Sequence, residues 1–145
     1  MDNSTDASFA WVDAINRQDL AALSDTLCDG FTWELGTSST SGAAQSVEAW
    51  RLWFVAFPDF RFEVVEAIAE GSTVCLRLRL TGTHRGPLQF RGTGSMGAPI
   101  APTDRSFDLP GCAVHHVEGR RISRLYAFWD TATLMRQIAA EPAAH

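Results

Sequence analysis

Hydrophobic positions in the first thirty residues predict two short amphipathic helices. In the first helix the apolar residues recur three apart, at Phe9, Val12 and Ile15. Ser4 or Asp6 can cap this helix, because both side chains accept hydrogen bonds from free backbone N–H groups. Asp19 can cap the second helix, which carries three leucines and ends before Gly30. The chain therefore opens with a helical hairpin.

The next forty residues predict a strand, a loop and an aromatic helix. Apolar residues alternate with polar ones at Phe31, Trp33 and Leu35, so Glu34 is expected on the solvent side of a short strand. Residues 36–46 contain few apolar side chains and predict a mobile loop that ends with Ser46 as a helix cap. The following helix should stop before Pro58. Its aromatic stripe is core or the wall of a ligand cavity, and consists of Trp50, Trp53, Phe54 and Phe57.

Two alternating segments follow and predict a pair of antiparallel strands. Apolar residues occupy every second position, at Phe60, Phe62 and Val64 and again at Val74, Leu76, Leu78 and Leu80. Continuing the second pattern places His84 on the inner face, as a core histidine or as a functional group. Residues 85–106 hold several glycines and prolines and predict a long loop or a distorted edge that borders any cavity.

The last third of the chain predicts a hairpin from Phe107 to Trp129 around Glu118-Gly119. The length of the turn decides which side chains share a face. A two-residue turn puts His115 on the face of Tyr126 and Phe128, and a bulged turn puts His116 there. One of the two histidines should therefore share the face of Asp130, provided that no further bulge intervenes.

Asp130 lies between the last strand and a final helix that starts at Thr131. Three aromatic residues precede it within four positions, and loss of water raises a carboxyl pKa toward the range useful for proton transfer. The alternative is structural, because aspartate is a preferred N-cap and the helix begins directly after it. Both interpretations stay open at this point.

Composition narrows the class of protein. With 145 residues, the chain is expected to form one domain over 1–145. Its 12 basic and 17 acidic residues give a net charge of −5, which disfavours nucleic acid and anionic membranes as partners. The spacing of Cys28, Cys75 and Cys112 argues against a disulfide framework and a zinc site. The N-terminus resembles no signal peptide and no long apolar segment is present, so a cytoplasmic protein is expected.

The order of elements predicts an α+β fold, a cone-shaped curved antiparallel or mixed sheet with the N-terminal helices over its concave face. Several short motifs in this order resemble the SnoaL-like polyketide cyclase family of the nuclear transport factor 2-like superfamily. They are the segments 57–60 (Phe-Pro-Asp-Phe), 81–86 (Thr-Gly-Thr-His-Arg-Gly), 102–103 (Pro-Thr), 118–122 (Glu-Gly-Arg-Arg-Ile) and 129–137, from Trp129-Asp130 to Arg136-Gln137. Residues 87–101 make a longer link than the family usually has.

The resemblance implies a homodimer with an apolar, cofactor-free pocket that takes a polyketide-like small molecule, in secondary metabolism such as antibiotic biosynthesis. In the family's aldol cyclases an aspartate at the end of the last long strand is the general acid/base, and Asp130 matches it. A histidine on the preceding strand assists. His116 is the closer match, and His115 remains an alternative.

The sequence thus predicts acid/base ring closure with Asp130 as catalyst and His116 or His84 as donor to the enolate oxygen, with no metal or cofactor. Six aromatic residues are expected to hold the substrate: Trp33, Trp50, Trp53, Phe57, Tyr126 and Trp129. One alternative is epoxide opening, which needs a second carboxylate such as Asp59 or Glu34 to converge on Asp130. Another is a binding or assembly module in which Asp130 is only a cap.

Overall fold

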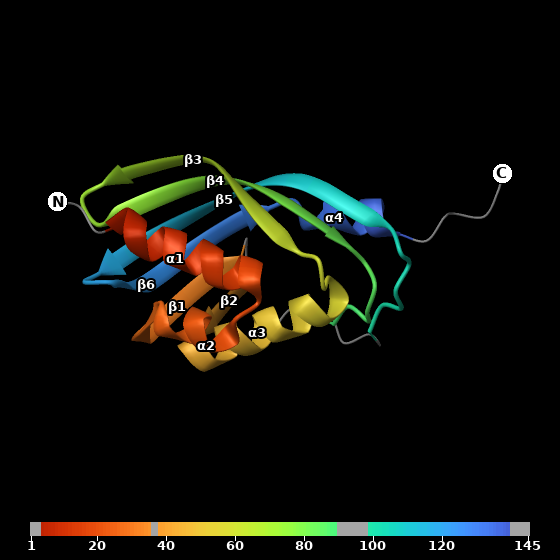
Figure 1. The fold of residues 1–145 in the computed structure, drawn as a ribbon, viewed down its shortest axis with the longest axis horizontal. Helices are drawn as coiled ribbons and strands as arrows, with labels where there is room; N and C mark the ends of the chain where they lie inside the picture. Colours follow the sequence, from red (N-terminus) through yellow and green to blue (C-terminus); the bar gives the residue numbers. More distant parts are fainter. Residues whose placement is uncertain (1–3, 36–37, 90–98, 140–145) are drawn as a thin grey trace.

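The computed structural model describes residues 4–35, 38–89 and 99–139. Its helices are α1 (Ser4–Arg17), α2 (Leu20–Asp25), α3 (Ala43–Ala56) and α4 (Thr131–Ile138). Its strands are β1 (Leu27–Leu35), β2 (Ser38–Ser41), β3 (Arg61–Glu70), β4 (Thr73–Thr83), β5 (Ser106–Glu118) and β6 (Arg121–Trp129). The described parts form the expected α+β architecture (Figure 1).

The six described strands form one curved, mixed sheet in the order β2-β1-β6-β5-β4-β3. Neighbouring strands from β3 to β6 are antiparallel, as the two long hairpins predict. β1 runs parallel to β6, so the first strand of the chain pairs with the last one and extends the sheet beyond β6. Parallel pairing of segments so distant in sequence leaves no local pattern, because it needs no turn between them.

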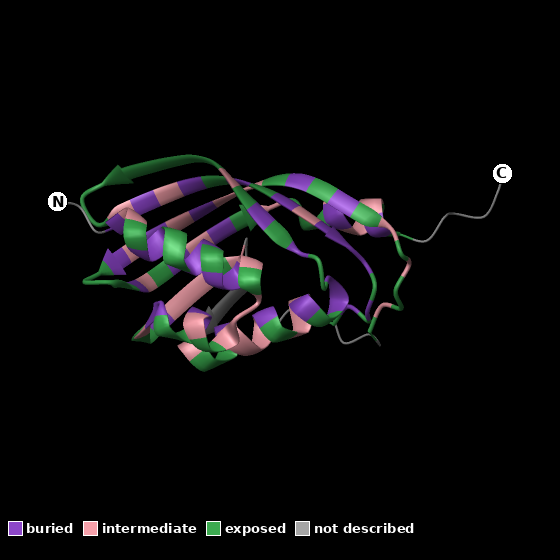
Figure 2. Cartoon of the chain, viewed as in Figure 1, coloured by how far each residue is buried: buried purple, intermediate pink, exposed green. Residues whose placement is uncertain are grey.

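Helices α1, α2 and α3 cover one face of this sheet, as predicted (Figure 1). The buried residues of α1 lie on the side that meets the sheet (Figure 2). Phe9, which helical spacing puts on the other side of α1, remains 44% exposed. On β4 the alternating leucines are buried and Arg77 and Arg79 are exposed. A single core therefore fills the space between the helices and the concave, inner face of the sheet.

Two predicted boundaries differ from the structure. The second helix ends at Asp25, and Leu27 already belongs to β1. The segment predicted as a loop before Ser46 instead contains β2 and the first turn of α3. Gly42 precedes α3 with φ 97°, a conformation that glycine adopts without steric cost, and Ser46 lies buried within the helix. β2 is an edge strand, which pairs through its backbone and needs no apolar side chains, so its polar sequence gave no strand pattern. Residues 36 and 37 of the predicted loop lie outside the described part.

A bulge in β6 changes which side chains share a face. Ile122 pairs with Val117 and Arg124 pairs with His116, so Ser123 is the additional residue on β6. After this extra residue the alternation reverses, and Leu125 and Ala127 become the buried positions. Tyr126 therefore points to the outer face, opposite to Ile122, whereas uninterrupted alternation along β6 would place these two residues on one face.

Candidate functional site

The inner face of the cone holds a continuous cluster of aromatic rings. Ring contacts link His115 to Trp11 with centroids 4.8 Å apart, Trp11 to Trp50 at 6.0 Å, and Trp50 to Trp53 at 6.5 Å. Trp53 contacts Phe57 at 4.7 Å, and Phe57 contacts His84 at 5.6 Å. Most of the cluster is core. Its polar members at the two ends are the histidines, and these are the candidates for chemistry.

Buried nitrogen atoms without a hydrogen-bond partner distinguish this interior from an ordinary core. Among the described residues, four ring nitrogens are buried and unpartnered: Trp33 Nε1, Trp53 Nε1, His84 Nε2 and His115 Nε2. Leaving such a group without a partner costs free energy, so each one in a native structure calls for an explanation, and a ligand is one. Two of them, on Trp53 and His84, belong to rings that both contact Phe57.

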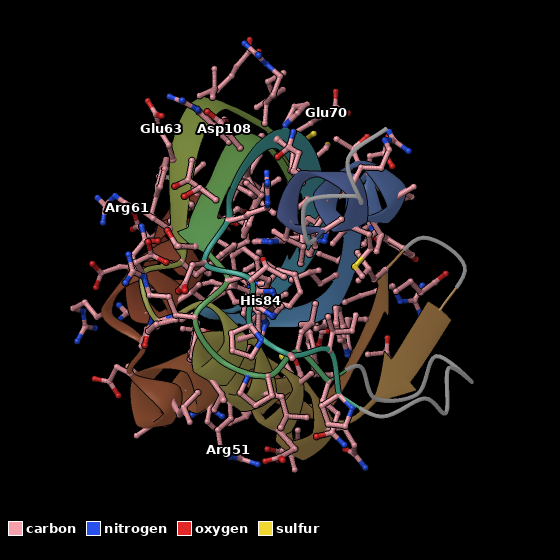
Figure 3. All side chains as sticks on the ribbon, turned by 90° about the vertical axis from the view of Figure 1, so that its right-hand side faces the viewer. Arg51, Arg61, Glu63, Glu70, His84 and Asp108 are labelled. Carbon is pink, nitrogen blue, oxygen red and sulfur yellow. The ribbon has the colours of Figure 1, made fainter. Side chains whose placement is uncertain are left out.

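His84 lies just beyond the end of β4 and is fully buried, as the alternation of β4 predicts. Viewed from the right-hand end of Figure 1, it lies between α3 and the sheet, whereas Arg51 and Glu63 project outward (Figure 3). Its backbone is fixed on both sides, because His84 N donates to Arg105 O at 2.9 Å and Asp104 N donates to His84 O at 2.8 Å. The backbone of His84 is thus paired with the 104–105 segment.

The contact with Thr103 indicates which nitrogen of the His84 ring carries the proton. The Thr103 hydroxyl donates to the Ile138 carbonyl at 2.6 Å, so its oxygen is left to accept from neighbours. That oxygen lies 3.4 Å from His84 Nδ1, a long contact in which Nδ1–H is the donor. In this tautomer the remaining ring nitrogen, Nε2, carries the lone pair, and it is buried with no hydrogen-bond partner of normal geometry. Burial lowers the pKa of His84, which favours the neutral ring, while weaker hydrogen bonding of the ring to the backbone of Gly86 and Ile100 opposes this shift.

His115 points inward, and His116 does not. His115 is fully buried, with Nδ1 2.8 Å from Ser8 Oγ, and burial lowers its pKa to about 3. His116 contacts the outward-facing Tyr126, with ring centroids 5.8 Å apart. The preference for His116 as the inward histidine is therefore wrong. The bulged register does put His116 on the face of Tyr126 and Phe128, but that face is the outer one.

The two inward histidines lie at opposite ends of the cone. His115 pairs with Val74 at the start of β4, whereas His84 follows the end of the same strand. Ten residues separate Val74 from His84, about 30 Å at roughly 3.3 Å per residue of extended strand. One small substrate cannot contact both. With its ring enclosed by Ser8 and Trp11, His115 fits a core histidine better than a catalytic one.

Asp130 is an exposed helix cap. It precedes α4, its Oδ1 accepts from Thr133 N at 3.0 Å, and its Oδ2 accepts from the Thr133 hydroxyl at 2.7 Å. These hydrogen bonds from Thr133, together with the charge of Arg136, lower the pKa of Asp130. The prediction that loss of water raises this pKa is therefore wrong, because Phe128 and Asp130 point away from the core.

None of the described residues supplies a buried carboxylate that could take the role predicted for Asp130. The buried polar side chains of the described residues are serines, threonines and the two histidines. Asp59 accepts from Thr83 N at 2.7 Å and from the Thr83 hydroxyl at 2.8 Å, and so secures the end of β4. Glu34 is exposed on β1. Within the same described segments, no group of three or more His, Cys, Asp or Glu side chains could hold a metal ion.

The predicted aromatic residues divide between the two faces. Trp50 and Phe57 are buried, and Trp33, Trp53 and Trp129 are partly buried against the core. Tyr126 lies outside this set. On the outer face, an open hollow of about 540 Å³ contains Phe128 and Asp130 among its lining residues, with Cys75 and Cys112 on the neighbouring strands β4 and β5. Sequence patterns did not indicate Thr103 as a partner of His84, because their contact depends on the long 85–106 segment.

Similar structures define the class of the fold. A protein from Jannaschia sp. CCS1 described as a SnoaL-like polyketide cyclase superposes with a TM-score of 0.82 and 22% identity, covering 97% of this chain and 94% of that one. IdmH from Streptomyces antibioticus, described as a polyketide cyclase, superposes with a TM-score of 0.75 and 22% identity, covering 94% of this chain and 99% of that one. An LEH-like epoxide hydrolase of M. tuberculosis superposes with a TM-score of 0.70 and 16% identity, covering 94% of this chain and 89% of that one. The fold is that of nuclear transport factor 2 and ketosteroid isomerase.

The family follows from the sequence itself. The model of the SnoaL-like polyketide cyclase family matches residues 5–138, so the chain belongs to that family. A comparison with curated proteins returned no significant match. None of the helices in the described segments is both long and apolar enough to span a bilayer.

Proposed function

We propose that this chain binds a flat, mostly apolar small molecule of polyketide type beside His84 and closes a ring in it by acid/base chemistry without a cofactor. The observation that carries the proposal is the buried, unpartnered Nε2 of His84 among aromatic rings. Membership of the SnoaL-like family supports the class of substrate. Fold likeness alone would not, since one scaffold hosts many reactions.

The proposed reaction uses His84 as the proton carrier. His84 Nε2 removes a proton α to a substrate carbonyl, and the resulting enolate carbon attacks a second carbonyl of the same molecule. The imidazolium then returns the proton to the new alkoxide, so that no atom is gained or lost. The lowered pKa of His84 keeps the ring neutral and able to accept a proton at pH 7.

Trp53 is proposed to orient the substrate. Its buried indole N–H has no partner and can donate to a substrate oxygen, where a donor in a dry site is worth most. Its ring also packs against Phe57, which in turn contacts His84. A flat substrate that lies against these rings would gain apolar contact area and satisfy two polar groups at once.

A binding module without catalysis is the second candidate. The observation that favours it is the lack of any buried carboxylate among the described residues. Epoxide opening has less support, because Asp59 and Asp130 each already accept two hydrogen bonds from a threonine and Glu34 is exposed.

His84→Gln separates the enzyme from the binder. Glutamine keeps hydrogen-bonding capacity but cannot carry a proton, so turnover of a linear poly-β-keto thioester should fall by roughly two to four powers of ten. Binding of the substrate should change only a few-fold. Ring formation is followed by absorbance of the cyclised product, and affinity by fluorescence titration. Wild-type protein that binds such compounds but never cyclises them would favour the binding module.

Two matched variants serve as controls in the same assay. His116→Gln alters a histidine of the outer face, and Asp130→Asn keeps a side chain that still caps α4. Both should retain wild-type turnover. Asp130→Ala should lower the melting temperature by a few degrees through loss of the cap, again with turnover intact. A large loss of turnover in Asp130→Asn would return the proton-transfer role to that residue.

A homodimer is proposed as the working form. The outer face is covered by none of α1–α3 and carries exposed apolar side chains, with Ile68 58% and Phe128 52% exposed. Around them, Arg77 pairs with Glu66 at 3.2 Å and Arg79 with Asp108, so the charges there are already neutralised. Sedimentation at micromolar concentration should give twice the monomer mass. A monomer at that concentration would contradict the dimer.

A cytoplasmic location in polyketide or antibiotic biosynthesis completes the proposal. The three cysteines are free thiols, which suits a reducing compartment. Polyketide chains are assembled from cytoplasmic thioester precursors, so a ring-closing protein would meet its substrate there. Detection of the protein in the cytoplasmic fraction tests the location.

A further inference from the structure

Two cysteines that are distant in sequence meet on the outer face of the sheet. Cys75 on β4 and Cys112 on β5 have their sulfur atoms 3.4 Å apart, as free thiols in contact. The register pairs Cys75 with Val114 and Cys112 with Arg77, so the two cysteines are diagonal neighbours on adjacent antiparallel strands. Both are partly exposed. Their spacing of 37 residues gives no local signal of this contact.

In the single chain the surroundings of the pair leave it reachable by small molecules, whereas the proposed homodimer would cover it. Both cysteines line the open hollow of the outer face, together with Ile68 and Phe128. The nearby ionic groups Arg77 and Glu66 pair with each other at 3.2 Å. The thiols therefore have each other as their closest reactive partner, in a site that a peptide-sized reagent can enter.

We propose that Cys75 and Cys112 are a reversible modification site, at which exchange with a low-molecular-weight disulfide such as oxidised glutathione converts the two thiols into one intramolecular disulfide. The Cys75 thiolate attacks one sulfur of the reagent and displaces one glutathione thiolate. Cys112 then gives up its proton to solvent and attacks the Cys75 sulfur of the mixed disulfide, displacing the second glutathione. Two protein thiols are oxidised, and one disulfide is reduced to two thiols.

The order of attack follows from how readily each thiol ionises. Burial, the hydrogen bond with Cys75 and the charge interaction with Cys75 raise the pKa of Cys112 to about 11. The raised pKa keeps Cys112 protonated where an ordinary thiol begins to ionise. A thiolate is the nucleophile in exchange, so Cys112 is the resolving thiol rather than the one that attacks first.

The geometry makes the disulfide reducible as well as accessible. A disulfide bond is about 2.05 Å long, so the two sulfur atoms must approach each other by about 1.4 Å from their 3.4 Å contact. Both positions are partly exposed, so the disulfide would stay accessible to reducing thiols, as a reversible modification requires.

Cys28 on β1 provides a matched control within the same chain. It is also a free, partly exposed cysteine, and burial raises its pKa. It does not line the hollow. A reagent that only modifies accessible thiols one by one would act on Cys28 as well, whereas disulfide formation needs the pair.

The test exposes the full-length, folded protein to oxidised glutathione and then counts free thiols by maleimide labelling and intact mass. We expect the wild-type protein to lose two thiols and about 2 Da, without a retained glutathione, and to recover both thiols with dithiothreitol. Cys28→Ser should behave in the same way. The Cys75→Ser and Cys112→Ser variants each keep one thiol of the pair. That thiol should either retain glutathione as a mixed disulfide or stay unmodified, and no intramolecular disulfide should form. The reaction is run over a dilution series, because a second copy on the outer face would slow oxidation.

Three results would overturn the proposal. One is a wild-type protein that retains glutathione on Cys75 or Cys112, because the pair would then be unable to close. Another is a disulfide that links two chains instead of bridging one chain. The third is a native protein whose pair stays reduced at all dilutions while denatured protein is oxidised.

Discussion

Replacing Trp11 by alanine is expected to lower the free energy of unfolding by about 3–5 kcal/mol, the usual cost of removing a buried tryptophan side chain. Trp11 is 1% exposed and lies where α1 meets the sheet. Its ring stacks on Phe62 at 5.3 Å and contacts Trp50 and His115 from the edge. The variant would open a cavity bordered by all three rings, and urea unfolding curves would measure the loss.

Phe9→Ala is the matched control for Trp11→Ala. Phe9 lies on the same helix but is 44% exposed on the opposite side, so the change should stay within about 0.5 kcal/mol. Equal losses in the two variants would mean that α1 does not present Trp11 to the sheet. The account of a core between helix and sheet would then fail.

Lowering the pH from 7 to 5 is expected to reduce the free energy of unfolding by about 2 kcal/mol through His115 alone. Burial lowers the pKa of His115 to about 3, while an unfolded histidine titrates near 6.5. Above pH 6.5 both states are neutral and the group has no effect. As the pH falls through 6.5 only the unfolded state gains the proton, so stability falls until the folded pKa is reached. Urea unfolding at pH 7, 6 and 5 measures the slope.

The adjacent histidines again provide a matched pair. His115→Gln should remove most of this pH dependence, whereas His116→Gln on the outer face should keep it. The lowered pKa of His84 acts in the same direction and leaves a residual slope in both variants. Ser8 and Trp11 are the α1 side chains in contact with His115, and neither titrates in this range. A wild-type slope in His115→Gln would show that His115 is not buried as a neutral ring.

Alternation of residue types predicted the strands because one sheet face is buried and the other is not. Along β4 the leucines are buried and the arginines that alternate with them are exposed, and the same count places His84 inside. The start of β1, the strand β2 and the first turn of α3 escaped prediction. Their positions depend on backbone pairing with β6 and β1, which side-chain patterns do not record.

Predictions of the site were less successful because they depended on one inserted residue. The extra Ser123 in β6 turns Tyr126 and Phe128 outward and leaves Ala127 inside. Counting residues through a hairpin cannot detect such a bulge, since a one-residue shift reverses every side chain beyond it. The same shift exposes Asp130, and the structure accounts for that residue as a cap. The contact of Thr103 with His84 also required the fold, because the two residues are nineteen positions apart in the sequence.

The central claim is that a ligand lies against His84 and Trp53 inside the cone, and titration of side-chain ring ¹⁵N signals tests it most directly. A polycyclic hydroxy-ketone would be added to ¹⁵N-labelled protein, with the indole signals assigned through Trp53→Phe and Trp129→Phe. We expect the Trp53 indole N–H signal to shift and saturate together with the His84 Nε2 resonance, which is read through its coupling to the ring C–H protons, since both nitrogens are buried without a partner. No shift of either nitrogen at saturating ligand, or shifts confined to indole signals other than that of Trp53, would contradict the account.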